Sequence, residues 1–214
     1  MMEWFLIVGF AISSSIDNLG VGMSYGIRDI RINWLSNLVI ATICFLFSEG
    51  GILFGNWLSA VIPGVLPDLI AAFILFAVGV RIILLALPRT KHSKELSANA
   101  KLMKPQQGKF AAILENPEMA DMDHSQEIGF GEAILLGIVL SANALTNGLS
   151  AGLIGLSPLA ISLVSAVGSF IAVWAGVYLG HKVVDFRIGS FTLGQFGTIL
   201  SGIILLLIAA HALW

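Results

Sequence analysis

The chain has 214 residues, of which 57% are hydrophobic and 11% are charged, and its formal net charge is −2. Soluble domains carry about 25% charged residues, and a chain of this length cannot bury so much apolar surface in one aqueous core. The composition excludes an ordinary soluble protein, and the net charge does not indicate a nucleic-acid partner. A single cysteine, Cys44, excludes an intrachain disulfide and the spacing of a zinc site. The lipid bilayer is therefore the expected solvent and partner.

Six stretches are long and apolar enough to cross a bilayer as helices, which takes about 20 residues. In chain order they are 4–27, 34–60, 67–87, 132–156, 158–180 and 191–213. The sequence predicts an all-α integral membrane protein of six transmembrane helices. Its expected parts are a first three-helix repeat over 1–87, a cytoplasmic linker over 88–131 and a second three-helix repeat over 132–214.

The positive charges predict the orientation. Ten of the eleven Lys and Arg residues follow the first, third or fifth stretch: Arg28, Arg31, Arg89, Lys91, Lys94, Lys101, Lys104, Lys109, Lys182 and Arg187. Six helices place all ten on one face, which is cytoplasmic by the positive-inside rule. We therefore expect a multi-pass plasma-membrane protein with both termini outside and the central loop in the cytoplasm.

The two halves carry similar short motifs. Ser15-Ile16-Asp17-Asn18 in the first stretch corresponds to Ala144-Leu145-Thr146-Asn147 in the fourth, and Gly26 then corresponds to Gly155. Because each half has three helices, the second half enters the membrane from the opposite face. This predicts a 3 + 3 inverted repeat, a plan of many secondary transporters that bind substrate near the midplane. Gene duplication without transport is the alternative.

Several polar side chains fall at mid-bilayer depth. Asp17 lies roughly 20 Å along the first helix, and Glu49 lies near the middle of the second. A carboxylate at the bilayer centre costs at least ~2.5–3.5 kcal/mol, so idle ones are not expected. Oxygen ligands suit a hard divalent cation such as Mn²⁺ or Mg²⁺, and they equally suit a proton relay. The structural alternative is a set of protonated carboxyl groups that join helices by hydrogen bonds.

The expected cation path comprises these carboxylates and the polar residues near them. Asn143 and Asn147 lie four residues apart and share a helix face, and Arg81 either reaches the interface or pairs with a carboxylate. The full set is Asp17, Asn18, Glu49, Arg81, Asn143, Thr146 and Asn147.

These motifs resemble those of the manganese efflux pump (MntP-like) family. The resemblance rests on Ser15 to Gly22 (SIDNLGVG), on Glu49 eight residues before Trp57, and on Gly79-Val80-Arg81-Ile82-Ile83. It covers both halves but not the central loop of the typical pump. It implies six helices, an inverted repeat, and a cation path lined by Asp17, Glu49 and Arg81. The family's second aspartate, in the fourth helix, corresponds here to Thr146, so one negative charge is missing.

Residues 121–132 have the spacing of an EF-hand calcium loop. The expected ligands are the side chains of Asp121, Asp123, Ser125 and Glu132 and the carbonyl of Glu127. Gln126 stands where a glycine is usual, and a non-glycine residue adopts that backbone conformation at a cost. We expect a site for Ca²⁺ or another divalent cation, in which the carboxylates converge. A solvated acidic linker is the alternative. A helix over 110–114 is expected before the loop, and segment 89–108 is expected to be mobile.

The expected function is a membrane transporter that exports a divalent metal cation such as Mn²⁺. An ion or proton gradient would drive it, because no P-loop motif is present. We expect no tightly bound cofactor and no enzymatic activity, because no HExxH motif or nucleophile pair lies at membrane depth. Two alternatives remain: a non-transporting structural or sporulation-related membrane protein, and a small-molecule (amino-acid) exporter whose substrate carboxylate would pair with Arg81. Assembly as a homo-oligomer is left open.

Overall fold

The computed structural model describes residues 2–62, 64–86, 120–123, 125–182, 187–188 and 191–211. Within them lie helices α1 (Met2–Ile27), α2 (Trp34–Val61), α3 (Leu66–Ala86), α6 (Phe130–Leu153), α7 (Pro158–Lys182) and α8 (Leu193–His211). A two-residue antiparallel pair, β1 (Arg187–Ile188) and β2 (Phe191–Thr192), precedes α8 and was not predicted. The helical class is confirmed. The predicted helix over 110–114 and segment 89–108 lie outside the described residues.

The described helices have the length and surface of membrane spans. Five of them, α1, α2, α3, α6 and α7, are long and apolar enough to cross a bilayer, and α8 adds a shorter apolar stretch, Gly202–His211. Large apolar side chains are exposed on all six, among them Phe5 (83% exposed) and Phe73 (72%). Soluble monomers rarely leave such large apolar patches exposed, whereas lipid covers them. The chain is therefore a multi-pass membrane protein.

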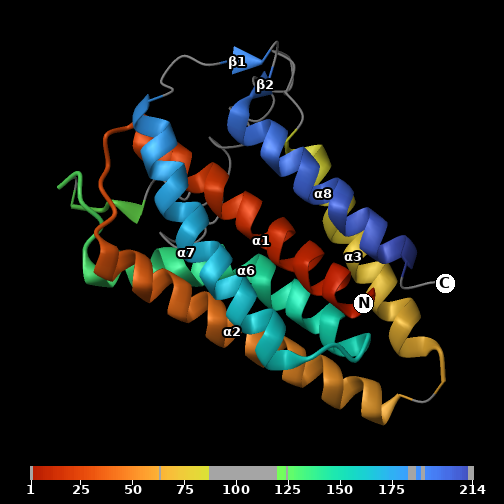
Figure 1. The fold of residues 1–214 in the computed structure, drawn as a ribbon. Coiled ribbons are helices and arrows are strands. Elements are labelled where there is room, and N and C mark those ends of the chain that lie inside the picture. Colours follow the sequence, from red (N-terminus) through yellow and green to blue (C-terminus); the bar gives the residue numbers. More distant parts are fainter. Residues whose placement is uncertain are drawn as a thin grey trace, which may run out of the picture.

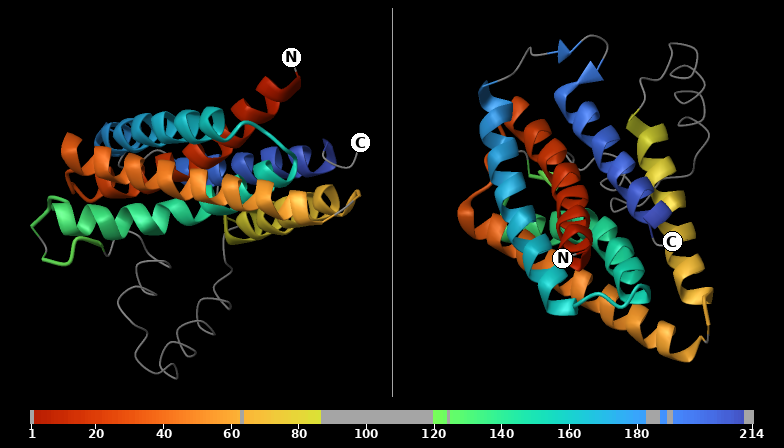
Figure 2. Two further views of the ribbon diagram at one scale, coloured as in Figure 1. Left: turned by 90° about the horizontal axis from the view of Figure 1, so that it is seen from below. Right: turned by 45° about the vertical axis from the view of Figure 1, so that its right-hand side comes forward.

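Each helix of the first half packs chiefly on a helix of the second half. α1 lies on α7, α2 on α6, and α3 on α8 (Figure 1). α2 also contacts α7, so α1, α7, α2 and α6 form a four-helix group. α8 contacts α1, and α3 contacts α6, so the α3–α8 pair lies beside that group (Figure 2).

Glycines bring the helices of this group into backbone contact. A Cβ atom on Gly22 of α1 would lie 2.6 Å from the carbonyl oxygen of Val173 in α7. A Cβ atom on Gly148 of α6 would lie 2.5 Å from the carbonyl oxygen of Ser48 in α2. Real Cβ atoms do not approach so closely, so any side chain there would separate the helices. Small residues at such contacts let transmembrane helices pack closely.

Two apolar cores flank a belt of buried polar residues. One core includes Tyr25, Ile40 and Leu136, near the α1–α2 connection. The other includes Phe10 and Ile52, toward the opposite ends of the helices. Between the cores lie the buried side chains of Asn18, Ser48, Ser141, Asn147, Ser165 and Ser169. The fold thus holds polar groups at mid-membrane depth with apolar packing on either side.

Candidate functional site

Asp17 of α1 meets Asn143 of α6 in this polar belt. Asn143 Nδ2 donates a hydrogen bond to Asp17 Oδ2 at 2.6 Å. Both side chains are partly buried, and Asp17 lies about 15 Å along the axis from the end of α1 at Ile27. A hydrogen bond to a carboxylate is short and strong. The pair joins the two halves of the chain at the depth where a cation path is expected.

Asn18 points to a different neighbour from Asp17. Its Nδ2 donates to Ser169 Oγ of α7 at 2.7 Å, and both side chains are 1% exposed. Consecutive helical residues differ by about 100° around the axis, so Asp17 can contact α6 while Asn18 contacts α7. α1 therefore connects the two pairs of the four-helix group through polar contacts.

Glu49 of α2 is turned toward α7. Ser162 Oγ donates to Glu49 Oε2 at 2.6 Å and also contacts the Pro158 carbonyl oxygen at 2.8 Å. Glu49 lies roughly 22 Å along the axis from Trp34, at the start of α2, and so about 7 Å further from the α1–α2 connection than Asp17 does. The two carboxylates have different hydrogen-bond partners, and their sharing of one ion stays a prediction.

Asn147 has no hydrogen-bond partner among the described residues although it is 3% exposed. Neither its amide nitrogen nor its oxygen is bonded, a state that costs about 1–3 kcal/mol for a buried polar group. Such groups call for an explanation, which a bound water or ion can supply. Thr146 differs, because its hydroxyl donates to the Ala142 carbonyl of its own helix at 3.1 Å.

Arg81 lies apart from these groups. Its side chain on α3 is exposed, and the described residues form no ion pair between Arg81 and Asp17 or Glu49. This arrangement favours the interfacial alternative for Arg81 over the internal counter-charge.

The acidic segment after Ala120 curls as an EF-hand-like loop. Carboxylate oxygens of Asp121, Asp123 and Glu132 lie within 4.8 Å of one another, which confirms the predicted convergence. Gln126 has a φ of 62°, the left-handed conformation that the usual glycine of such a loop adopts. Asp121 and Glu132 are buried, and Asp123 is exposed.

Hydrogen-bond donors stabilise this convergence. The Ser125 N–H donates to Asp121 Oδ1 at 3.1 Å and to Asp123 Oδ1 at 3.0 Å. The Ser125 hydroxyl and then its N–H hold the pKa of Asp123 below its ordinary value. Glu132 accepts the N–H groups of Met122 at 2.7 Å and Gly129 at 3.0 Å. Glu132 therefore caps the first turn of α6, so it has a structural role with or without an ion.

Two other predicted ligands of the loop contact each other. The Ser125 hydroxyl donates to the Glu127 carbonyl oxygen at 2.8 Å. An ion at this loop would therefore have to compete with that hydrogen bond for both oxygens.

The acidic loop is also joined to the α1–α2 connection. The Arg31 N–H donates to the Gln126 carbonyl at 2.8 Å, and the Ile128 N–H donates to the Arg31 carbonyl at 2.9 Å. The Ser36 hydroxyl of α2 donates to the Ile128 carbonyl at 2.7 Å. Ile128 is 1% exposed. A change in the loop would therefore reach α1 and α2 as well as α6.

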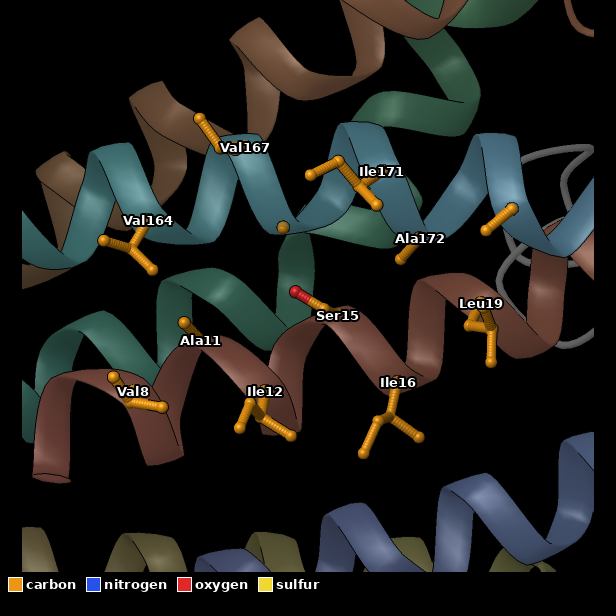
Figure 3. A pocket seen from close by; sticks show the side chains of 12 residues that line it. Val8, Ala11, Ile12, Ser15, Ile16, Leu19, Val164, Val167, Ile171 and Ala172 are labelled. Atoms are coloured by element: carbon orange, nitrogen blue, oxygen red, sulfur yellow. The ribbon is translucent and has the colours of Figure 1, made fainter.

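An apolar groove with a volume of about 470 Å³ lies between α1 and α7 (Figure 3). Val8, Ile12, Val167 and Ile171 line it, and each is at least 44% exposed. The groove therefore belongs to the lipid-facing surface. None of the predicted path residues lines it.

Sequence reasoning did not identify Ser162 and Ser169, which bond Glu49 and Asn18, as site residues. Ser162, Ser165 and Ser169 recur at intervals of three and four, which places them on one helix face, so a signal was present. Serines in transmembrane helices often bond back to their own backbone, however, and their spacing alone does not distinguish that role from a site.

Comparison with known proteins agrees with the resemblance noted in the motifs. The model of the family described as "Putative manganese efflux pump" matches residues 1–83 and 110–213. The chain is 30% identical over 183 residues to "Probable sporulation protein YtaF" of Bacillus subtilis (strain 168), which covers 84% of this chain and 87% of that protein. No solved structure matches the chain. The family match includes every residue of the path and the acidic loop.

Proposed function

The chain belongs to the manganese efflux pump (MntP-like) family, and from this premise we propose that it exports a divalent metal cation such as Mn²⁺ by a gradient-driven mechanism. The observation that carries the proposal is the Asp17–Asn143 pair, held by a 2.6 Å hydrogen bond between two apolar cores. A carboxylate at that depth is costly unless a cation, a proton or a hydrogen bond compensates it. Carboxylate and amide oxygens are the ligands that Mn²⁺ and Mg²⁺ prefer.

We further propose that the two halves are an inverted repeat. The ends of α1 and α6 support this, because each closes on a residue with positive φ, Asp29 at 61° and Gly155 at 80°. The Asp29 N–H donates to Gly26 and the Gly155 N–H to Gly152, and in each case the next N–H bonds a carbonyl five residues back. This pattern is a helix C-terminal motif with a left-handed residue. In such a repeat α1 corresponds to α6, and α7 corresponds to α2. The α1–α7 pair therefore corresponds to the α6–α2 pair, and both pairs are closely packed.

The same ends suggest a register for the repeat. If Asp29 corresponds to Gly155, then Gly22 corresponds to Gly148, and Asp17 corresponds to Asn143. The sequence motifs alone had set Asp17 against Thr146. In the register proposed here, the residue that replaces the second acidic group of the family is the hydrogen-bond partner of the first.

Cation binding would reorganise this pair. A cation at Asp17 displaces the Asn143 amide nitrogen, and rotation of the amide by about 180° presents its oxygen instead. Asn147 lies one turn further along the same face of α6, and neither of its polar atoms is bonded to a described residue, so it can act as a second neutral ligand. The apolar cores on either side would open alternately as the two halves move, as in other inverted-repeat transporters. In the proposed topology, the termini lie outside and the acidic loop is cytoplasmic.

We also propose that the acidic loop binds Ca²⁺ or another divalent cation through Asp121, Asp123, Ser125, Glu127 and Glu132. Support comes from the converging carboxylates and from the left-handed conformation of Gln126. Because the loop is bonded to the α1–α2 connection, an ion there would act on α1 and α2 from the cytoplasmic side.

Transport in sealed vesicles tests the main proposal. Wild-type protein is expected to move Mn²⁺ along an imposed ion or proton gradient. Asp17→Asn should reduce transport at least about tenfold, because it removes the charge that offsets a divalent ion. Asp68→Asn is the matched control, since Asp68 is exposed in the first turn of α3. If no divalent ion is transported under any gradient, or if Asp17→Asn behaves as Asp68→Asn does, the proposal is wrong.

A non-transporting structural role is the second candidate. The Asp17–Asn143 and Glu49–Ser162 bonds join helices, as the structural alternative requires. The relative's name associates that protein with sporulation. A wild-type protein that transports no ion, and in which Asp17→Asn lowers thermal stability, would support this candidate.

A further inference from the structure

Four helices each contribute one fully buried polar residue to a cluster in the middle of the four-helix group. The members are Asn18 of α1, Cys44 of α2, Ser141 of α6 and Ser169 of α7, and none is more than 1% exposed. Asn18 Nδ2 donates to Ser169 Oγ at 2.7 Å, and the Cys44 thiol lies beside the hydroxyls of Ser141 and Ser169. We refer to these four residues as the Cys44 cluster.

One hydroxyl of the cluster, that of Ser141, has no strong hydrogen-bond partner among the described residues. Ser141 is 0% exposed, and the described residues offer its hydroxyl no hydrogen-bond partner but the Cys44 thiol, which is a weak hydrogen-bond donor and acceptor. A fully buried hydroxyl left in this state costs free energy, and a bound water or ion is one partner that can satisfy it. The hydroxyl adjoins the one thiol of the chain, and a ligand at this point would contact both.

We propose that the Cys44 cluster is a binding site along the cation path and that its sulfur selects borderline transition metals over Mg²⁺ and Ca²⁺. This inference rests on the proposed export of a divalent cation. Hard cations prefer oxygen ligands alone, whereas thiolate favours Zn²⁺, Cd²⁺ and related ions. The donor set is three neutral oxygens and one sulfur: the Asn18 amide, the Ser141 and Ser169 hydroxyls and Cys44 Sγ. Asn18 presents its oxygen after an amide rotation, which only exchanges the positions of its two polar atoms.

Two negative charges can balance the charge of a divalent ion bound at this site. The thiolate is the form of cysteine that binds metal, so the S–H bond breaks, its electron pair goes to the metal, and the proton leaves to water. The thiolate supplies one negative charge. Asp17, the neighbour of Asn18 in α1, supplies the second, so a divalent ion that passes between the Asn143 pair and the Cys44 cluster remains compensated.

Metal binding to the purified, detergent-solubilised full chain tests the inference directly. Cd²⁺ is the probe, because cadmium–thiolate bonds give an ultraviolet charge-transfer band and Cys44 is the one cysteine of the chain. The wild type is expected to show a saturable band, and Cys44→Ser should abolish it. Ser141→Ala should keep the band and weaken Cd²⁺ binding. Absence of the band in the folded wild type would overturn the inference whether or not Cys44→Ser folds.

Ion selectivity in vesicles provides the second readout. Cys44→Ser should lower the ratio of Cd²⁺ or Zn²⁺ transport to Mg²⁺ transport by about tenfold, because a hydroxyl oxygen in place of the sulfur removes the preference for these metals. An unchanged ratio would overturn the inference and leave the proposed function intact. A wild type that shows the thiolate band but transports no ion would contradict the proposed function, and with it the placement of the Cys44 cluster on a transport path.

Discussion

At the scale of single residues, Asn143 controls how much negative charge the centre of the membrane carries. Its amide donates to Asp17 at 2.6 Å. Two carboxylates at that distance would repel each other in the absence of a cation. An amide avoids this repulsion, so the site is stable with one charge, but it attracts a divalent ion less strongly than two charges would.

Asn143→Asp is therefore expected to tighten Mn²⁺ binding by about tenfold at neutral pH, since the ion would offset both charges. Asn143→Leu, of similar size, should weaken binding because it removes the amide ligand. Calorimetric titration of the purified variants measures both effects. Equal affinity in Asn143→Asp and wild type would place the ion elsewhere.

Substitution of Glu49 can distinguish the contribution of its charge to transport from the contribution of its hydrogen bond to stability. Glu49→Gln keeps an oxygen that accepts the Ser162 hydroxyl, so the free energy of unfolding should change by less than about 1 kcal/mol. Transport should nevertheless fall at least about tenfold, because the path loses a carboxylate. Thermal unfolding and vesicle transport are measured on the same preparation. Full transport by Glu49→Gln would assign Glu49 to structure alone.

At the scale of helices, the backbones of α2 and α6 approach closely at glycines, and this contact is expected to contribute to stability. A Cβ on Gly55 would meet the Gly152 Cα at 3.0 Å, and the carbonyl of Leu149 lies closer still. Gly50, five residues earlier in the same helix, has no atom of another described helix within 4 Å of its Cβ position. The two glycines therefore occur in one helix for different reasons, and they form a matched pair.

Gly55→Ala is expected to destabilise the protein by about 1–3 kcal/mol, because overpacking forces the helices apart. Gly50→Ala should leave stability unchanged or raise it by roughly 0.5–1 kcal/mol, since alanine has the higher helix propensity. Unfolding in detergent, followed by circular dichroism, compares them. Equal effects would mean that α2 and α6 do not approach as described.

The acidic loop requires variants that separate ion binding from helix capping. Asp123 is exposed and caps no helix, whereas Glu132 accepts two N–H groups at the start of α6. Asp123→Asn should weaken Ca²⁺ and Mn²⁺ binding at the loop and leave stability within about 0.5 kcal/mol. Glu132→Gln should reduce both. If Asp123→Asn and the wild type titrate identically, the loop is a capped acidic turn and not an ion site.

At the scale of the whole molecule, the distribution of Lys and Arg residues over the connections predicts an orientation that labelling can check. In a Cys44→Ser background, a cysteine at position 93, introduced as Ser93→Cys, should react with an impermeant maleimide only from the cytoplasm. Ser157→Cys, in the exposed α6–α7 connection, should react only from outside. Reaction of Ser93→Cys from outside would overturn the proposed orientation of every connection.

Much of the architecture was predictable because it depends on local properties of the chain. The length of an apolar stretch determines whether it can cross a bilayer, so the expected span 4–27 closely matches Met2–Ile27 of α1. The EF-hand spacing predicted the convergence of Asp121, Asp123 and Glu132, because a short loop leaves few alternative arrangements. In each case the residues that determine the outcome lie close together in the sequence.

The partners across the halves were decided by the tertiary structure alone. Nothing local in the sequence indicates that Asp17 meets Asn143, or that Glu49 meets Ser162. These contacts depend on which helix faces fit closely, and that fit requires small residues on both partners at once. The buried environment of Cys44 has the same origin, because four helices must pack before a single thiol acquires polar neighbours.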